Sequence, residues 1–154
     1  YTLMVNGANF VTSPTLYAKA LYDPIRDFEA ISLLAHAPNV LVVHPSLPVK
    51  SVRELIAFAK ARPGDILFAG SGSGSTPHLA GELFRTLTGT KMVHVPYRGT
   101  GPAITAILSG EVSTMFMPAL TALPLIQGNR IRALAVTSLE RLPALPELPT
   151  VNES

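Results

Sequence analysis

A glycine-rich stretch between an apolar run and a periodic run is the feature that most constrains how this chain can fold. Residues 70–74 place a glycine at every second position among serines, after the strand-like run 66–69 and before the helix-like run 79–87. Glycine tolerates a positive φ and lets a ligand approach the backbone. A helix start exposes unpaired N–H groups and carries about half a positive charge. With Thr76 as the expected N-cap and Pro77 at the first helical position, the stretch predicts a loop that holds an anion such as a carboxylate or phosphate.

Three established loop motifs do not fit this stretch. A phosphate-binding P-loop ends in Gly-Lys-Ser/Thr, whereas the order here is Gly74-Ser75-Thr76, without a lysine. A dinucleotide fingerprint needs glycine or alanine where Pro77 stands, and an acid after the next strand, where Pro96-Tyr97-Arg98 follows. A nucleophile elbow needs glycines two residues either side of a serine, and neither Ser71 nor Ser73 has them. A generic anion cradle and a plain flexible loop remain as the two interpretations.

Strand-like and helix-like runs alternate from residue 39 onward, with short connections between them. The expected strands are 40–43, 66–69, 92–95, 112–117 and 132–137, and the expected helices are one that starts at Ser51 with capping-box spacing to Glu54, then 79–87, 103–108 and 119–127. In the helix 79–87, Leu79, Leu83 and Leu87 are expected to face the core and Glu82 to face outward. Roughly five strand–helix cycles predict an α/β fold, with a mainly parallel sheet and helices on both of its faces. The uninterrupted apolar strands fit a sheet that is buried on both sides.

The two ends of the chain lie outside this alternation. Residues 1–5 are strand-like, and the polar turn 6–9 that follows either faces a ligand or simply reverses the chain. A short helix is expected from Ser13 to Ala20, and 28–37 is expected to be extended. Residues 142–150 repeat Leu-Pro-x three times, which predicts a stiff, extended crossover or linker, with an SH3-type ligand as the alternative. Because the first residue is not a methionine and starts within a strand-like run, we expect a piece of a longer protein.

Composition narrows the functional classes. The chain has 154 residues, enough for one compact domain, and its 47% apolar content excludes a disordered chain. We expect no membrane span, because no run of 18 apolar residues occurs, and we expect no signal peptide within these residues. A net charge of +2 with scattered basic residues argues against nucleic acid as a partner. The absence of cysteine excludes disulfides. No metal or cofactor is expected, because the histidines lack metal-ligand spacing: His36, His44, His78 and His94.

A second glycine-rich loop, residues 97–102, follows the next strand and opens the next helix. Both loops are expected at the same carboxyl edge of the sheet, where two helix N-termini would converge on one anionic ligand. Arg98 either supplies charge or is a solvated surface residue, and Tyr97 either lines a pocket or packs in the core. His78 is expected to be neutral, in contact with the ligand or the loop, or else structural. Neither loop contains an acid or an identifiable base, which disfavours hydrolase or transferase chemistry.

Several motifs together resemble the Bug-type periplasmic solute receptors of tripartite tricarboxylate transporters. The motifs, in chain order, are Tyr22-Asp23-Pro24 with Asp27-Phe28, residues 38–43, Ser51-Val52-Arg53-Glu54-Leu55, residues 70–78 with Leu79-Ala80-Gly81-Glu82-Leu83-Phe84, residues 94–99, residues 132–137 and the closing run 148–154. The resemblance covers nearly the whole chain. It implies a lobe like that of type II periplasmic binding proteins, from a two-lobed receptor that closes on a small carboxylate. Such a receptor is expected to be periplasmic and to present its ligand to membrane permease subunits.

The resemblance also implies which residues contact the ligand, through backbone N–H groups, hydroxyls and ordered water. The residues that match the family's ligand loops are Ser71, Gly72, Ser73, Gly74, Ser75, Thr76, His78, Tyr97, Gly99, Thr100, Pro102, Ala103, and, in the first-lobe turn, Asn6 and Asn9. The family's opening strand, its first-lobe glycine loop and the closing part of its first lobe have no counterpart in this sequence. We therefore expect residues 1–38 to be a first-lobe remnant and crossover, 39–138 the ligand-binding lobe and 139–154 a Pro-rich crossover or linker.

Three functions stay open on the residues alone. The first is a receptor, not an enzyme, for uptake of a small carboxylate: a di- or tricarboxylate, an acidic amino acid or an aromatic acid. The second is a ligand-sensing module that feeds a signalling partner, and the third is a small anion-handling transferase. A lone lobe is expected to bind its ligand weakly. It is also expected to form a homodimer through the sheet edge that the missing lobe leaves exposed.

Overall fold

The fold is built on a five-stranded sheet of order β3-β2-β4-β1-β5. The computed structural model describes residues 2–17, 19 and 21–154. The strands are β1 (Asn39–Val43), β2 (Leu67–Gly70), β3 (Val93–Pro96), β4 (Thr114–Pro118) and β5 (Arg132–Val136). The helices are α1 (Ala8–Leu16), α2 (Val52–Ala61), α3 (Thr76–Thr88), α4 (Thr100–Ser109) and α5 (Ala119–Gln127), with a 3-10 turn, η1 (Val151–Glu153). Every strand and helix expected from residue 39 onward is present.

Four of the five strands run in one direction. β2 pairs in parallel with β3 and β4, whereas β1 pairs antiparallel with both β4 and β5. The prediction of a mainly parallel sheet is therefore confirmed, and β1 is the exception. Its reversal has a consequence for the site: the start of β1 lies at the same edge as the ends of the other four strands.

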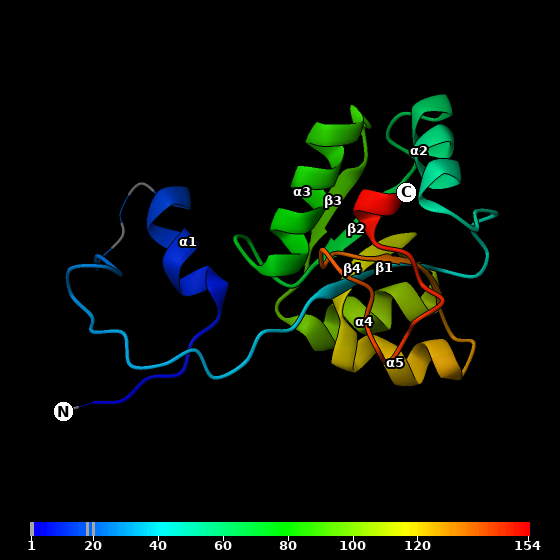
Figure 1. The fold of residues 1–154 in the computed structure, drawn as a ribbon. Coiled ribbons are helices and arrows are strands. Elements are labelled where there is room, and N and C mark those ends of the chain that lie inside the picture. The colour runs from blue at the N-terminus through cyan, green and yellow to red at the C-terminus, as the bar shows by residue number, and fades with distance from the viewer. Residues whose placement is uncertain (1, 18, 20) are drawn as a thin grey trace.

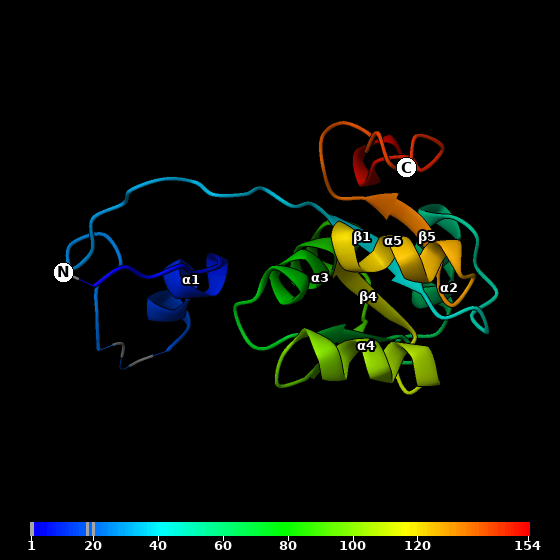
Figure 2. The same ribbon diagram turned by 90° about the horizontal axis from the view of Figure 1, so that it is seen from below.

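Helices cover both faces of the sheet, as expected. In Figure 1, α2 and α3 lie above the sheet and α4 and α5 below it, and Figure 2 shows the same layers from below. The side chains of β1 alternate between the two cores: Leu41 and Val43 face the first, and Val40 and Val42 the second. All four are fully buried, which is what a strand covered on both sides requires. None of the helices in the described part of the chain is long and apolar enough to span a bilayer.

The buried face of α3 differs from the expected one. Pro77, Gly81 and Phe84 are its buried residues, whereas Leu83 and Leu87 are 59% and 77% exposed. The prediction that these leucines face the core was therefore wrong. The reason is the close approach of the helix to the sheet at Gly81, where a methyl group would overlap the ring of Phe68. Periodicity identified the helix, but the small residue and not the leucines marks the side that packs.

The N-terminal region also departs from its expected structure. Residues 2–5 form no strand, and the polar turn expected at 6–9 instead leads into α1, with Gly7 as the N-cap and Ala8 as the first helical residue. The helix expected from Ser13 to Ala20 begins five residues earlier, and Ala20 lies outside the described residues. Pro14 stands inside this helix and has no N–H for the carbonyl of Phe10. The hydroxyl of Tyr22 takes its place, donating to that carbonyl at 2.8 Å.

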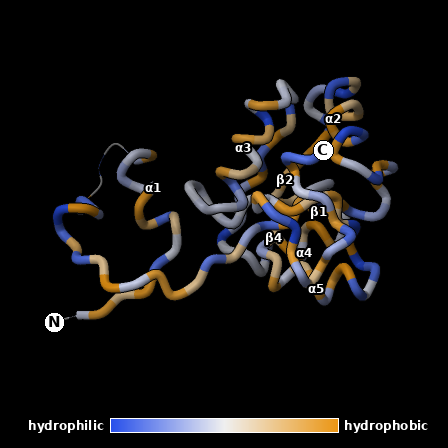
Figure 3. Tube along the Cα trace, viewed as in Figure 1, coloured by the Kyte–Doolittle hydropathy of each residue, from blue (hydrophilic) through white to orange (hydrophobic). Residues whose placement is uncertain are grey.

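Residues 21–38 contain no helix or strand, as expected for 28–37, and they carry apolar side chains on the surface. Ile31, Leu33 and Leu34 are each at least three-quarters exposed. Figure 3 shows these apolar stretches along the path that joins α1 to the sheet. The body of the molecule, with both of its cores, begins only at Asn39.

The Leu-Pro-x repeat forms successive turns, so the prediction of an extended segment was wrong. The N–H of Leu145 donates to the carbonyl of Leu142, and that of Leu148 to Leu145, at 2.9 and 3.0 Å. A turn every third residue keeps the leucines on one side, where all three pack against the second core. The chain then reaches Thr150, which bridges to Val136 at the end of β5.

The contact between Gly81 and Phe68 predicts a clear effect on stability. Gly81→Ala places a methyl group against the fully buried ring of Phe68, and we expect it to destabilise the fold by about 1–3 kcal/mol. Gly101→Ala is the matched control, because a methyl group at that position in the first turn of α4 meets nothing within 4 Å. Urea unfolding measures both. Equal stability of the two variants would contradict the close packing of α3 on β2.

Candidate functional site

The two glycine loops lie side by side at one edge of the sheet. Gly70 at the end of β2 is in register with Pro96 at the end of β3, and the N–H of Tyr97 donates to the carbonyl of Gly70 at 2.9 Å. The chain moves outward from β2 to β3 and then back across β2 to β4, which places α3 and α4 on opposite faces. Such a reversal of strand order is where ligands bind in open α/β sheets. The expected convergence of the two loops is confirmed.

The first loop is stabilised by a tight turn around Ser75. The N–H and the hydroxyl of Ser75 both donate to the carbonyl of Gly72, at 3.2 and 2.7 Å. The same hydroxyl accepts the N–H of His78 at 3.4 Å, so Ser75 is the N-cap of α3. Thr76 was expected in that role, but it is the first helical residue, with Pro77 second. A serine can turn its hydroxyl to the loop carbonyl and the helix N–H at once, which sequence spacing alone does not show.

Within the described residues, both loops leave backbone donors without a protein partner. On the first loop they include the N–H groups of Ser73 and Thr76, and on the second those of Thr100 and Gly101. No side chain caps α4, whose N-cap is Gly99 at a φ of 107°. Because helix N-termini carry partial positive charge, these four amides form a donor surface for an anion. Arg98, on the second loop, is exposed.

Tyr97 contributes to the second loop through its backbone. Its side chain packs against the second core, and its hydroxyl donates to Oε1 of Glu111 at 2.7 Å. Burial of the phenol, together with the hydrogen bond and the negative charge of Glu111, raises the pKa of Tyr97 to about 12. The side chain is thus held by core packing and by Glu111, which fits the packing interpretation. A ligand contact at Tyr97 remains a prediction and would use its main chain.

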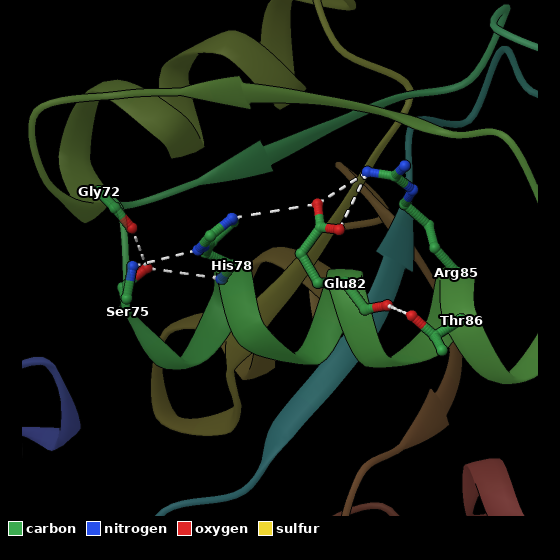
Figure 4. A network of polar contacts seen from close by, with 7 residues as sticks. Gly72, Ser75, His78, Glu82, Arg85 and Thr86 are labelled. Carbon is green, nitrogen blue, oxygen red and sulfur yellow. Dashed lines mark hydrogen bonds and ion pairs between the residues drawn. The ribbon is translucent and has the colours of Figure 1, made fainter. Parts of the chain in front are cut away.

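His78 lies directly behind the first loop, as part of a polar network along α3 (Figure 4). Its Nδ1 accepts the N–H of Gly74 at 3.1 Å, and its Nε2 lies 4.0 Å from Oε1 of Glu82. Arg85 holds both carboxylate oxygens of Glu82, at 2.8 and 3.0 Å. His78 therefore contacts the loop, one of the alternatives that the sequence left open.

His94 is a member of this site that sequence reasoning missed. Its ring stacks on that of His78, with centroids 4.2 Å apart. Gly70 has no side chain where the Nε2 of His94 lies, and within the described residues this buried nitrogen has no hydrogen-bond partner. Burial lowers the pKa of His94, as do the neighbouring His78 and Arg85, while Glu82 opposes them. The sequence signals were its position on the strand beside the first loop and its place at the start of the motif 94–99.

The remaining residues predicted to contact the ligand differ in their exposure. The side chain of Ala103 is buried under α4, whereas Pro102 is exposed in its first turn. Asn6 and Asn9 are exposed. It is Thr12 of α1 that reaches the first loop, where its hydroxyl donates to the carbonyl of Gly74 at 2.9 Å. Figure 1 shows α1 beside the loop that precedes α3.

Two hollows of the molecule lie away from the loops. One, of about 510 Å³, is lined by Arg132, Leu145 and Ile126 near the start of β5, at the opposite edge of the sheet. Another lies between α3 and η1 and is lined by Leu83, Leu87 and Val151. The described residues hold no cluster of three side chains suited to a metal ion.

Comparisons with known proteins identify the lineage of the chain. The model of the tripartite tricarboxylate transporter family receptor, TctC, matches residues 1–154. BugT of Bordetella pertussis is 35% identical over 155 residues, which cover 99% of this chain and 48% of BugT. A protein from Pseudomonas sp. strain P51, named for the tcbD–tcbE intergenic region, is 36% identical over 154 residues, 100% of this chain and 46% of its own. The chain thus spans about half the length of the curated relatives it matches.

Solved structures give the same result. The R. palustris protein Rpa4515 with adipate is 41% identical with a TM-score of 0.85, over 89% of this chain and 46% of its own. The periplasmic binding protein BugD is 34% identical with a TM-score of 0.89, over 95% and 49%. MatC from Rhodopseudomonas palustris with bound malate is 27% identical with a TM-score of 0.87, over 95% and 50%. The resemblance seen in the motifs is confirmed, and the chain belongs to the tripartite tricarboxylate transporter receptor family.

Proposed function

We propose that this chain carries the carboxylate-binding half of an extracytoplasmic solute receptor. The observation that carries the proposal is the pair of helix N-termini, at Thr76 and Thr100, whose N–H groups at one sheet edge have no partner among the residues that the structure describes. A carboxylate is small, planar and anionic, and it accepts several such donors at once. Two of the structural relatives, Rpa4515 and MatC, were solved with adipate and with malate, respectively. The ligand that we propose is therefore a small organic acid. The proposed location of the receptor is the periplasm.

Binding without turnover fits the side chains around the loops. The acids near the site are engaged: Glu82 is held by Arg85, and Glu111 accepts the hydroxyl of Tyr97. Neither sits in one of the two glycine loops, where a general base would have to reach a bound substrate. This arrangement supports a receptor over an anion-handling transferase.

The proposed partners follow from a receptor role. The loaded receptor would deliver its ligand to membrane permease subunits, and a sensing role through a signalling partner is the alternative. A neighbouring permease gene would support delivery, and a neighbouring kinase gene would support sensing.

The outer edge of β3 pairs with no other described strand, and Val93 on it is 43% exposed. This edge is where we propose that a homodimer would form, and a monomer in light scattering at high concentration would contradict it.

A charge placed at the start of α3 tests the anion site. Thr76 is exposed and is the first residue of the helix. In Thr76→Asp the carboxylate would favour the helix dipole, so we expect stability to be kept, while adipate binding falls at least about tenfold because like charges repel. Thr76→Asn, nearly the same shape without charge, is the control.

Chemical-shift titration with adipate measures both variants, and thermal unfolding checks their stability. Equal adipate affinity in Thr76→Asp and Thr76→Asn would show that the carboxylate does not bind at this helix start.

The affinity of the lone chain is a second test. Micromolar binding requires about 8 kcal/mol, whereas a hydrogen bond to a charged group contributes about 1.5–3 kcal/mol and a helix terminus about 0.3–1 kcal/mol. Two or three such contacts fall short once the entropy of association is subtracted. We therefore expect calorimetry with adipate to give millimolar binding or none for the 154-residue chain. Low-micromolar binding would show that one lobe is a complete site.

A further inference from the structure

Gly74 is held from both sides of the glycine loop. Its N–H donates to Nδ1 of His78 on α3 at 3.1 Å, and its carbonyl accepts the hydroxyl of Thr12 on α1 at 2.9 Å. Its φ is 77°. A Cβ at this position would lie 2.7 Å from Cδ1 of Leu16 and 2.8 Å from the hydroxyl of Thr12. Gly74 is therefore the point where α1 meets the loop, and a glycine is needed there for both its conformation and its lack of a side chain.

The hydrogen bond to Gly74 defines the protonation of His78. An imidazole nitrogen that accepts an N–H carries no proton, so the neutral ring has its proton on Nε2. That nitrogen faces Glu82, which Arg85 fixes through two contacts. On its other side, the ring stacks on His94. The acceptor Nδ1 is thus aimed at the loop by groups from both α3 and β3.

We propose that neutral His78 is a positioning residue, which holds Gly74 in the left-handed conformation that docks α1 onto the carboxylate loop through Thr12. The inference rests on the proposed receptor function, because the loop it positions is the one that would hold the carboxylate. The helices α1 and α3, which are far apart in the chain, are joined through the N–H and the carbonyl of Gly74. The state of one imidazole is thereby linked to the contact between the N-terminal helix and the site.

Protonation of His78 would break this link. With a proton on both nitrogens, the ring has only donors to offer, and Nδ1–H would then face the N–H of Gly74. The charged or titratable groups that face His78 are Glu82 and Arg85 on α3 and His94 on β3. The residues of α1 at the contact, Thr12 and Leu16, do not titrate. The pKa of His94 is lowered, chiefly by burial, so His94 is disposed to remain the neutral member of the pair.

The expected pH dependence has a sign that separates the proposal from simple attraction. A positive imidazolium near the loop would by itself bind a carboxylate more tightly at low pH. If only neutral His78 supports the binding conformation, the apparent affinity instead follows the neutral fraction. Because imidazole is the side chain that gains a proton in this range, the neutral fraction falls from pH 8 to pH 6, where carboxylic acids remain ionised.

The test compares the 154-residue chain with two variants in chemical-shift titrations with adipate at pH 8 and pH 6. The unsubstituted chain should bind adipate more weakly at pH 6 than at pH 8, by roughly severalfold. His78→Asn keeps an acceptor near the position of Nδ1 without titrating, and should retain affinity within about threefold at both pH values. His78→Leu removes the acceptor and should bind about tenfold more weakly at both. Tighter binding at pH 6, or the same pH dependence in His78→Asn, would overturn the proposal.

A ligand-free measurement separates this proposal from the receptor function. The amide signal of Gly74 should shift with the protonation of the His78 ring and should stay constant in His78→Asn. In Thr12→Val, which lacks the hydroxyl, the signals of α1 should lose this pH response, whereas Thr12→Ser should keep it. A Gly74 amide signal that does not shift with the protonation of His78 would overturn the positioning role. An intact Gly74 response without any adipate binding would support the link between His78, Gly74 and Thr12 independently of the receptor function.

Discussion

The parallel pairing of β2 with β3, followed by the return of the chain across β2 to β4, is the constraint on which the site depends. Because parallel neighbours must be joined by a crossover, each strand end is followed by a helix start. The reversal of direction then sends α3 and α4 to opposite faces, so their N-termini flank one edge. The donor surface is therefore a product of topology. It needs only glycines in the loops and no charged side chain.

Electrostatics at this edge depend on few full charges, because the two acids near the loops are already engaged. Glu82 is held by Arg85, and Glu111 by Tyr97. What remains is the exposed Arg98, the partial charge of two helix ends, each worth about 0.3–1 kcal/mol, and the hydrogen bonds of the loop amides. Such a surface recognises a carboxylate by its shape and its acceptors. The rest of the ligand must be recognised by other parts of the receptor, which fits a chain that spans about half the length of its relatives.

The sequence predicted the helix layers on both sides of the sheet and the sheet edge that carries the two glycine loops. It did not predict which face of α3 is buried. Strand and helix periods are local, and every strand and helix expected after residue 39 was found. The inward face of α3 was mispredicted because the close approach at Gly81 outweighs the burial of Leu83 and Leu87. The N-cap moved from Thr76 to Ser75 because one hydroxyl serves two partners. His94 and Thr12 could not be found from spacing, since both reach the loop from distant parts of the chain.

The most direct test of the central claim is the map of backbone amide shifts as adipate is added to the isotope-labelled chain. The account predicts that the amides of Ser73, Thr76, Thr100 and Gly101, on both loops, shift together with a single dissociation constant. Shifts confined to one loop, or gathered instead around the hollow near Arg132 and Leu145 at the opposite edge, would contradict it.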